Sequence, residues 1–116
     1  MPQTRRIRGE VAFPSDVTGG VAASVTLELR DVSMQDQAST IVASKTMRNV
    51  ALGANGRITF ELDAPVVAQN RSLAMRVEVT MVPSPSGAGV NFLSTVSTPV
   101  SAAGEVDGLV VPVSRI

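Results

Sequence analysis

The sequence predicts an all-β protein, an antiparallel β-sandwich of about seven or eight strands of the immunoglobulin or transthyretin kind. Three observations support this class. Short segments alternate apolar and polar residues, which is typical of strands with one buried face. Turn residues recur between these segments, roughly every ten positions. No segment sustains the periodicity of an amphipathic helix.

Two strands are expected in the first third of the chain. Residues 7–13 place Ile7, Val11 and Phe13 on one face, and Arg8 and Glu10 on the other. A turn at Gly19-Gly20 leads into residues 21–31, the most regular alternation in the sequence. The face expected to be buried carries Val21, Ala23, Val25, Leu27 and Leu29, and the opposite face carries Ala22, Ser24, Thr26, Glu28 and Arg30. A polar loop follows over residues 31–39.

The third strand is expected over residues 41–47, with a less regular pattern. Ile41, Ala43, Lys45 and Met47 alternate with Val42, Ser44 and Thr46. A lysine in a strand discourages pairing with another chain, so this segment is expected at a sheet edge. Asn55-Gly56 predicts a tight turn, because both residues tolerate positive φ. Beyond it, Ile58, Phe60 and Leu62 share one face of a strand.

Residues 66–70 are the one place where a short helical turn is allowed, with an irregular crossover as the alternative. The second long alternation spans residues 73–81, and its apolar face carries Leu73, Met75, Val77, Val79 and Met81. If this strand neighbours residues 21–31, Glu28 and Arg30 meet Arg76 and Glu78 in pairs of opposite sign. Such exposed pairs contribute about 0.2–1 kcal/mol each, which favours one register.

The last third of the chain begins with a proline-, serine- and glycine-rich connection over residues 83–89. Strand character returns over residues 90–96, Pro99 interrupts it, and residues 102–108 are rich in turn formers. Leu109, Val111 and Val113 form the final strand. Pro112 lacks an amide donor, so its position belongs at an edge or faces solvent.

Composition is consistent with one domain spanning residues 1–116, with residues 1–5 as a flexible N-terminal tail. The core has to be aliphatic, because the chain has three Phe and neither Trp nor Tyr. Ten basic and ten acidic residues balance, so no bulk attraction to nucleic acid or to an anionic membrane is implied. No apolar run is long enough for a membrane-spanning helix, and the first residues do not resemble a signal peptide.

The chain contains no cysteine and no histidine, which excludes a thiol nucleophile, a disulfide and the usual general base. Lys45 is the only lysine, and Ser44 and Thr46 point to the opposite face of its strand, so a Ser–Lys dyad is not expected. Two carboxylate pairs could in principle serve glycoside hydrolysis, Glu105 with Asp107 and Asp31 with Asp36. Their context does not indicate burial. We therefore expect no enzyme, and no catalytic, cofactor-binding or metal-binding residues.

Other short motifs each have a structural explanation. Asp31, Ser33 and Asp36 offer oxygens to calcium, but a capped, solvated loop explains them as well. Residues 70–72 match a glycosylation acceptor, and residues 87–89 are too short for a phosphate-binding loop. The arginines near the start could contact a phosphate surface, with a mobile terminus as the alternative; they are Arg5, Arg6 and Arg8.

Recognition of a protein partner remains as the function that the residues allow. An edge strand can accept a partner's strand through backbone hydrogen bonds. Exposed methionines would add adaptable apolar contacts, and the candidates are Met34, Met47, Met75 and Met81. Met75 and Met81 are expected in the core, whereas Met34 lies in a polar loop. The binding residues stay unassigned at this point.

Several segments resemble the YbaY/YscW family of bacterial lipoproteins. They are Ile7-Arg-Gly-Glu-Val11, Val25-Thr-Leu-Glu-Leu-Arg-Asp-Val-Ser33 and Ile58-Thr-Phe-Glu-Leu62. Arg71-Ser-Leu-Ala-Met-Arg-Val77 is similar to the family's long strand that begins with arginine, and Phe92-Leu-Ser-Thr95 and Pro99-Val100 are similar to its closing strands. The segments follow in the family's order over nearly the whole chain.

This resemblance implies a β-sandwich of the cell envelope with no known catalytic centre, lipid-anchored through an N-terminal cysteine. For the YscW branch it implies a pilot that binds the tail of an outer-membrane secretin in type III secretion. The chain has no lipobox cysteine and lacks the family's later tyrosines, so no family binding residues are carried over. We expect the cell envelope, facing the periplasm, if an export segment was removed, and the cytoplasm otherwise. The alternative is a stand-alone cytoplasmic module with a structural or oligomerising role through its edge strands.

Overall fold

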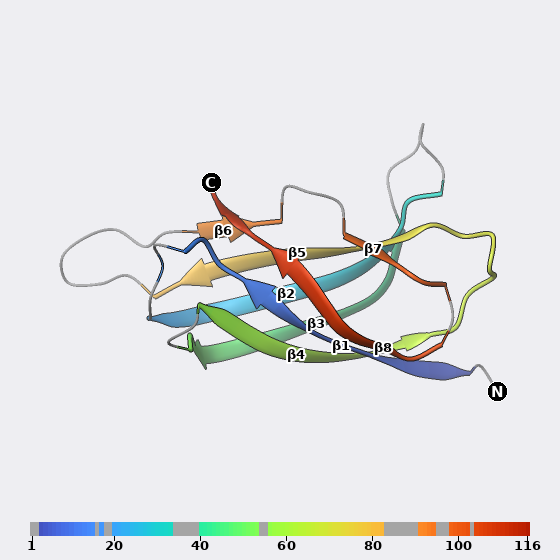
Figure 1. The fold of residues 1–116 in the computed structure, drawn as a ribbon, viewed down its shortest axis with the longest axis horizontal. Coiled ribbons are helices and arrows are strands. Elements are labelled where there is room, and N and C mark those ends of the chain that lie inside the picture. The colour runs from blue at the N-terminus through green and yellow to red at the C-terminus, as the bar shows by residue number, and fades with distance from the viewer. Residues whose placement is uncertain are drawn as a thin grey trace.

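The structure is a computed structural model that describes residues 3–15, 17, 20–33, 40–53, 56–82, 91–94, 98–102 and 104–116. These residues form nine strands and no helix. The strands build two facing sheets (Figure 1), which confirms the predicted all-β sandwich. They are β1 (Thr4–Ala12), β2 (Val21–Asp31), β3 (Thr40–Ala51), β4 (Arg57–Pro65), β5 (Leu73–Met81), β6 (Asn91–Leu93), β7 (Thr98–Val100), β8 (Val106–Pro112) and β9 (Ser114–Arg115).

The two sheets differ in size and in the direction of their strands. The smaller one has the order β4-β1-β8, and the larger one has the order β3-β2-β5-β6-β9, with β7 also paired to β5. β8 runs parallel to β1, whereas a purely antiparallel sandwich was expected. A hairpin would force antiparallel pairing, but the chain reaches β8 from β7 in the other sheet, so the direction of β8 is free of that constraint.

The chain changes sheets at Val113, and this residue links the two layers. Its amide donates to the carbonyl oxygen of Ala12 at 3.0 Å, and its side chain is buried in the core. Immediately after it, β9 pairs with β6 of the larger sheet. Pro112 is exposed on β8, the end strand of the smaller sheet, as its missing amide donor predicted.

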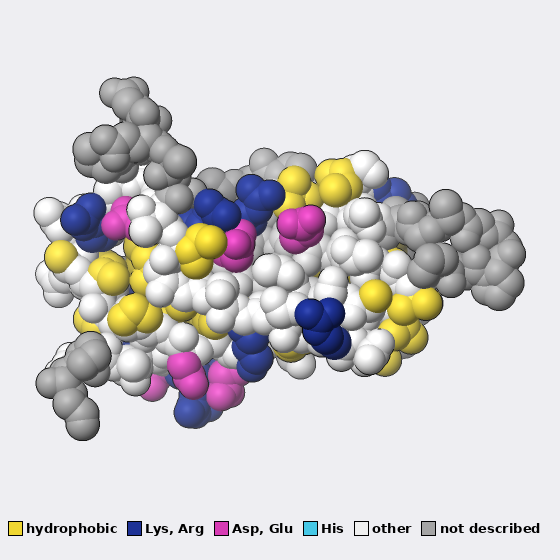
Figure 2. Space-filling view, turned by 180° about the vertical axis from the view of Figure 1, so that it is seen from behind, with side chains coloured by type: hydrophobic (Ala, Val, Ile, Leu, Met, Phe, Trp, Pro, Cys, Tyr) yellow, Lys and Arg dark blue, Asp and Glu magenta, His cyan; other side chains and the backbone are white. Residues whose placement is uncertain are grey.

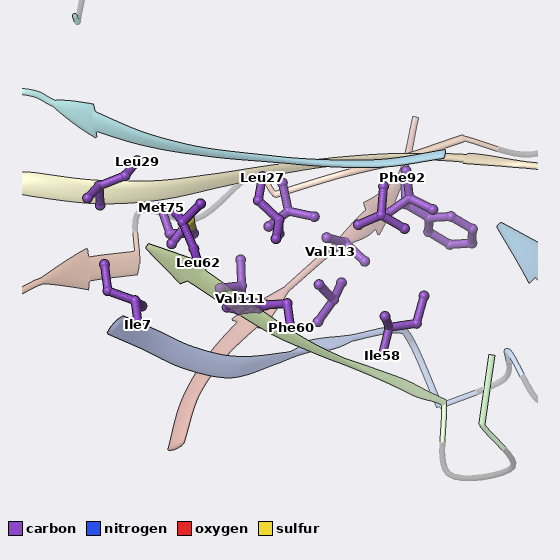
Figure 3. Close-up of a cluster of buried hydrophobic side chains, with 14 of the residues drawn as sticks. Ile7, Leu27, Leu29, Ile58, Phe60, Leu62, Met75, Phe92, Val111 and Val113 are labelled. Atoms are coloured by element: carbon purple, nitrogen blue, oxygen red, sulfur yellow. The ribbon is translucent and has the colours of Figure 1, made fainter. Parts of the chain in front are cut away.

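The core is a largely aliphatic layer between the sheets, and Figure 3 shows the side chains of the two layers pointing toward one another. At one end, Phe13 and Phe92 meet edge to face with ring centroids 5.0 Å apart. The smaller sheet contributes Ile7, Val11, Ile58, Phe60, Leu62 and Val111, and the larger sheet contributes Val25, Leu27, Leu29, Leu73, Met75, Val77, Val79 and Phe92. Burying each such side chain stabilises the fold by about 1.5–3 kcal/mol.

β2 departs from the expected alternation at Ala23. Val25, Leu27 and Leu29 are buried as predicted, but the next inward residue is Ala22, while Val21 is exposed. The register with β5 shifts between Ala22 and Ser24, so Ala23 is the extra residue of a β-bulge. In β3, Asn49 lies opposite this point with φ 54°, a left-handed backbone that asparagine tolerates better than most residues. The bulge reverses the faces beyond it.

The remaining turn and strand predictions have mixed outcomes. β3 ends the larger sheet, which confirms the edge strand. Gly56 has φ 69° and its amide donates to Gly53, as a tight turn requires, while Asn55 lies outside the described residues. Residues 66–70 form an irregular crossover with one turn, in which Arg71 N donates to Ala68 O, and no helix.

Near the C-terminus, residues 91–93 of the strand predicted over residues 90–96 form β6, and Ser94 lies beyond its end. The rest of that prediction and the connection over residues 83–89 lie outside the described part of the chain. Pro99 was expected to interrupt a strand, and this is wrong. It lies in the middle of β7, opposite Ala74 of β5, on the exposed face. Because β7 is short and borders β5 on one side, its missing amide costs little.

The expected tail over residues 1–5 is wrong for its last two residues. Thr4 and Arg5 belong to β1 and pair with Pro65 and Ala64 of β4. Arg5 occupies an inward position, where an apolar residue would have revealed the strand. A charged residue at that position breaks the apolar pattern, so the first residue pairs between β1 and β4 could not be predicted from the sequence.

The predicted neighbours β2 and β5 are confirmed, and so is one of the charge pairs between them. Glu28 lies opposite Arg76, with Oε1 and Nε 3.8 Å apart. Glu28 also pairs with Arg30 on its own strand at 3.0 Å. Arg30 itself lies opposite Ala74, not Glu78, so the second expected cross-strand pair is not a direct one.

Gly9 of β1 allows the close approach of β8, because a Cβ there would lie 2.2 Å from the carbonyl oxygen of Leu109. We expect Gly9→Ala to push β8 away and to lower the free energy of unfolding by about 1–3 kcal/mol, measured by urea denaturation. Gly108→Ala is the control. It adds only the strain of φ +75° with open space around the methyl group, and should cost about 1 kcal/mol. A smaller loss at Gly9 than at Gly108 would contradict this explanation.

Candidate partner-binding site

Two strand edges, which we call open because no described strand is hydrogen-bonded to them, lie next to each other at one side of the sandwich. One belongs to β3, the end strand of the larger sheet, and the other to β4, the end strand of the smaller one. The side chain of Lys45 spans them, since its Nζ donates to the carbonyl oxygen of Glu61 at 2.9 Å. Lys45 lies opposite the buried Leu27, on the inward face of its strand. An inward-pointing charge of this kind protects an edge from indiscriminate pairing.

A groove of about 490 Å³ opens beside these edges, and residues of β1, β3, β4 and β8 line it. Gly108 contributes no side chain, and the space where its Cβ would lie is open. The register of β1 and β8 shifts at this point, with Asp107 and Gly108 as the two β8 residues opposite Arg8. We call this the charged groove; it consists of Arg8, Gly9, Glu10, Lys45, Met47, Thr59, Phe60, Glu61, Asp107 and Gly108.

The walls of the charged groove carry exposed ion pairs. Arg8 Nε lies 3.1 Å from Glu61, and Arg57 Nη1 lies 2.9 Å from Glu10. Arg6 Nε, just outside the groove, also contacts Glu61 at 3.0 Å. Exposed pairs contribute at most about 1 kcal/mol, so a charged partner can exchange with them at small cost. The half-buried Met47 supplies an apolar side chain to the lining, whereas the side chain of Phe60 is buried in the core.

The charged groove is not predictable from the sequence. Its lining residues come from four strands, and nothing in the local pattern brings Lys45 next to Glu61. The one local signal is Asp107-Gly108, where a glycine with positive φ forms the bulge of β8. That signal indicates an irregular strand but not which strand it lies beside.

The three N-terminal arginines do not form one basic patch. Arg6 and Arg8 point outward from β1 and pair with the carboxylates of β4. Arg5 points inward and is buried. Alternation along a strand therefore separates residues that are close in the sequence.

Asp31 and Ser33, considered above as calcium ligands, tie the end of β2 to the start of β5. Asp31 Oδ1 accepts hydrogen bonds from the amide and the hydroxyl of Ser33, at 3.0 and 2.6 Å. Ser33 Oγ accepts from Ser72 N at 2.8 Å, and Arg71 Nη1 lies 3.5 Å from the other oxygen of Asp31. The Ser33 hydrogen bonds, followed by the Arg71 charge, hold the pKa of Asp31 below its usual value. These contacts account for the Asp-Val-Ser motif without an ion.

The other candidate residues are dispersed over the surface or lie outside the described residues. Glu105 accepts a hydrogen bond from Arg6 N at 2.9 Å, while Asp107 lines the charged groove. Asn70 is exposed at a turn. Within the described ranges, no group of three or more acidic side chains is placed to hold a metal, and no helix could span a membrane. Met34, Asp36 and residues 87–89 lie outside those ranges.

The burial of the three methionines in the described strands follows from their place in each strand. Met75 is buried, as predicted, and Met81 is half-buried at the end of β5. Met47 is half-buried and lines the charged groove. It is therefore the methionine that the structure offers to a partner.

An open strand edge beside a groove is a surface that peptide-binding modules use. The family model of the type III secretion system lipoprotein chaperone, YscW, matches residues 2–84, which is well over half of the chain. The chain therefore belongs to the YscW family, and the resemblance drawn from its motifs is confirmed. A chaperone family implies a protein partner, and its members are described as lipoproteins.

Among solved structures, the chain is similar to an alternative pilotin from the type II secretion system of Vibrio cholerae. The TM-score is 0.69, with 18% sequence identity, over 97% of this chain and 98% of that one. At this identity the likeness concerns the fold. No curated protein matches the sequence.

Ser33→Ala removes a hydroxyl donor to Asp31 and an acceptor for Ser72, so we expect a lower melting temperature near neutral pH. A carboxylate whose pKa is lowered by folding stabilises the protein above its unfolded pKa, and this contribution is lost as the pH falls through the folded value. The part of the melting-temperature difference between wild type and Ser33→Ala that is due to Asp31 should therefore shrink as the pH falls below about 3.9, the ordinary aspartate pKa. Thermal unfolding followed by circular dichroism at several pH values measures it. Ser44→Ala, on the exposed β3, is the control, and a pH-independent difference for Ser33→Ala would contradict the role of the carboxylate.

Proposed function

We propose that this protein is a pilot chaperone of the cell envelope that binds the tail of a secretin. The observation that carries the proposal is the YscW family match over residues 2–84. That segment contains β1 to β5, which supply both open edges and most of the charged groove. The similar fold of a pilotin, named for a secretion system, supports the pilot role.

The proposed location is the cell envelope, on the periplasmic side, and the lipid anchor of the family has no cysteine to carry it within this chain. The description of the family as lipoproteins supports this location. The proposed action is non-enzymatic: the chaperone holds a segment of its partner and changes no covalent bond. The absence of histidine and cysteine from this chain is consistent with such a role.

The charged groove and the free edge of β3 together suggest how a tail would bind. β3 is 12 residues long, and one side of it has no strand partner among the described residues. A tail segment uses the backbone groups on that side, while an apolar residue contacts Met47. Lys45 determines which charge the bound segment should carry. A partner that displaces the Lys45 ammonium group from Glu61 O has to supply another hydrogen-bond acceptor for it. We therefore expect an acidic residue in the bound segment.

Calorimetry with a synthetic peptide of the secretin tail from the same organism tests this proposal. We expect a Kd in the micromolar range or tighter, about −8 kcal/mol. Lys45→Glu should weaken binding at least tenfold, about 1.4 kcal/mol, because it repels the acidic residue. Arg48→Glu is the matched control, since it makes the same charge change on the same strand but on the outward face. No binding by the wild type, or an equal loss in both variants, would overturn the proposed site.

The open edge of β3 also favours a second function, self-association of the chain. Lys45 argues against it, because its charge lies at the edge that would pair. We expect the wild type to sediment as a monomer and Lys45→Val to form dimers or larger species in sedimentation velocity. A wild type that dimerises, with the dimer lost in Lys45→Glu, would favour the oligomerising function over the pilot role.

A further inference from the structure

Arg5 is the one charged side chain among the described residues that is buried in the sandwich. Only 5% of it is exposed, and it lies on the inward face of β1, two residues before Ile7. Its Nη1 donates to the carbonyl oxygen of Gly104 at 3.2 Å and to Ser101 Oγ at 3.4 Å. Both acceptors are neutral, and no carboxylate of the described residues forms an ion pair with it.

The other two nitrogens of Arg5 are buried without an acceptor. They are Nε and Nη2. In a guanidinium group these two nitrogens lie on the same edge and direct parallel N–H bonds outward. This edge matches the two oxygens of a carboxylate, which it binds in a bidentate manner. The unused donors of Arg5 are therefore a complete carboxylate-binding fork.

An unfilled fork among buried side chains is costly, because a buried charge without a partner destabilises a fold. Burial lowers the pKa of Arg5, but an arginine stays protonated at physiological pH. A leucine or methionine at this inward position would pack in the layer without that cost. The cost is explained if the fork has an occupant that the isolated chain does not supply.

The surroundings of Arg5 indicate what carries the anion. Val66 N donates to Gln3 O at 2.9 Å and Val67 N to Ala102 O at 3.3 Å, so the crossover after β4 and the connection before β8 meet at the start of β1. Both valines are only half-buried, and Val32, tied to Ser72 of the same crossover, is 40% exposed. Figure 2 shows hydrophobic side chains gathered at this end of the molecule, on the left of the view. A carboxylate on an apolar peptide segment fits these surroundings better than a free inorganic anion.

We propose that Arg5 is the receptor for a carboxylate of a peptide partner, with one oxygen bound by Nε and the other by Nη2. The identity of the partner rests on the proposed function, whereas the receptor itself can be tested without a partner. Because both nitrogens are buried, the ligand reaches them only after the surrounding side chains rearrange. This site is separate from the charged groove, since Arg5 is not among the residues that line it.

The first test follows the Arg5 Nε–Hε resonance by NMR in isotope-labelled protein titrated with sodium acetate, against sodium chloride at equal ionic strength. We expect a saturable downfield shift of this resonance with acetate and none with chloride. Arg8 Nε–Hε, on the outward face and paired with Glu61, is the internal control and should not saturate. Arg5→Lys keeps the charge without the fork and should abolish the stabilisation that acetate gives in thermal unfolding.

A second variant covers the case in which Arg5→Lys does not fold. Ser101→Ala removes a weak acceptor of Nη1 and leaves Nε and Nη2 intact, so the acetate response should persist. Arg5→Met should raise the urea midpoint in the absence of acetate, because it removes an unpaired buried charge. A lower midpoint for Arg5→Met, or an acetate response equal to that of chloride, would overturn the receptor.

The final arm separates this inference from the proposed function. The secretin-tail peptide is compared in calorimetry with a version in which every carboxylate is replaced by an amide. A tighter Kd for the carboxylate form that Arg5→Lys reduces, both in the wild type and in the Lys45→Glu background, supports Arg5 as the receptor. A preference for the carboxylate form that Arg5→Lys does not change leaves the pilot function standing and overturns the role of Arg5. Acetate binding that the peptide does not compete for overturns the assignment to a peptide carboxylate.

Discussion

The burial of one thin aliphatic layer between two sheets is the constraint on which the rest of the structure depends. With three Phe and no Trp or Tyr, the chain fills this layer mainly with valine, leucine and isoleucine. Short side chains require the two sheets to lie close together, and few large side chains remain to cover the core at the two sides of the sandwich. The chain closes one side by moving from β8 to β9 at Val113, and the opposite side by the stem of Lys45. Both solutions use residues whose side chains or backbone reach from one sheet to the other.

The same constraint explains where binding surfaces arise. Residues inside the layer are committed to packing, so recognition is left to the edges and ends, where the layer stops. The charged groove lies at an edge, beside β3 and β4, and its exposed ion pairs exchange at small cost. Arg5 lies at an end, where a charge replaces a core residue. The two sites therefore differ in energy as well as in place, since a buried charge without a partner is far more costly than an exposed pair.

The motifs that identify the YscW family in this chain are explained by packing and hydrogen bonds. Asp31 and Ser33 form one half of a tie, and Arg71 and Ser72 form the other half. Gly9, in the first family segment, is required by the close approach of β8. Residues that mark the family thus set the register of strands, and those on β1 and β4 also line the charged groove. Lys45 and Met47 of β3 join that groove from outside the family segments.

The sequence by itself determined the all-β class, most strand positions and the inward faces of β1, β4 and β5, because alternation is a local property of an extended chain. It also indicated that β3 is an edge strand, through Lys45. Only the tertiary structure decided the bulge at Ala23, since Val21, Ala22 and Ala23 are all apolar and either parity fits the pattern. The parallel pairing of β8, the charged groove and the burial of Arg5 were likewise beyond the sequence. Each depends on which distant strands lie side by side, and that choice is made by the packing of the whole layer, not by any one segment.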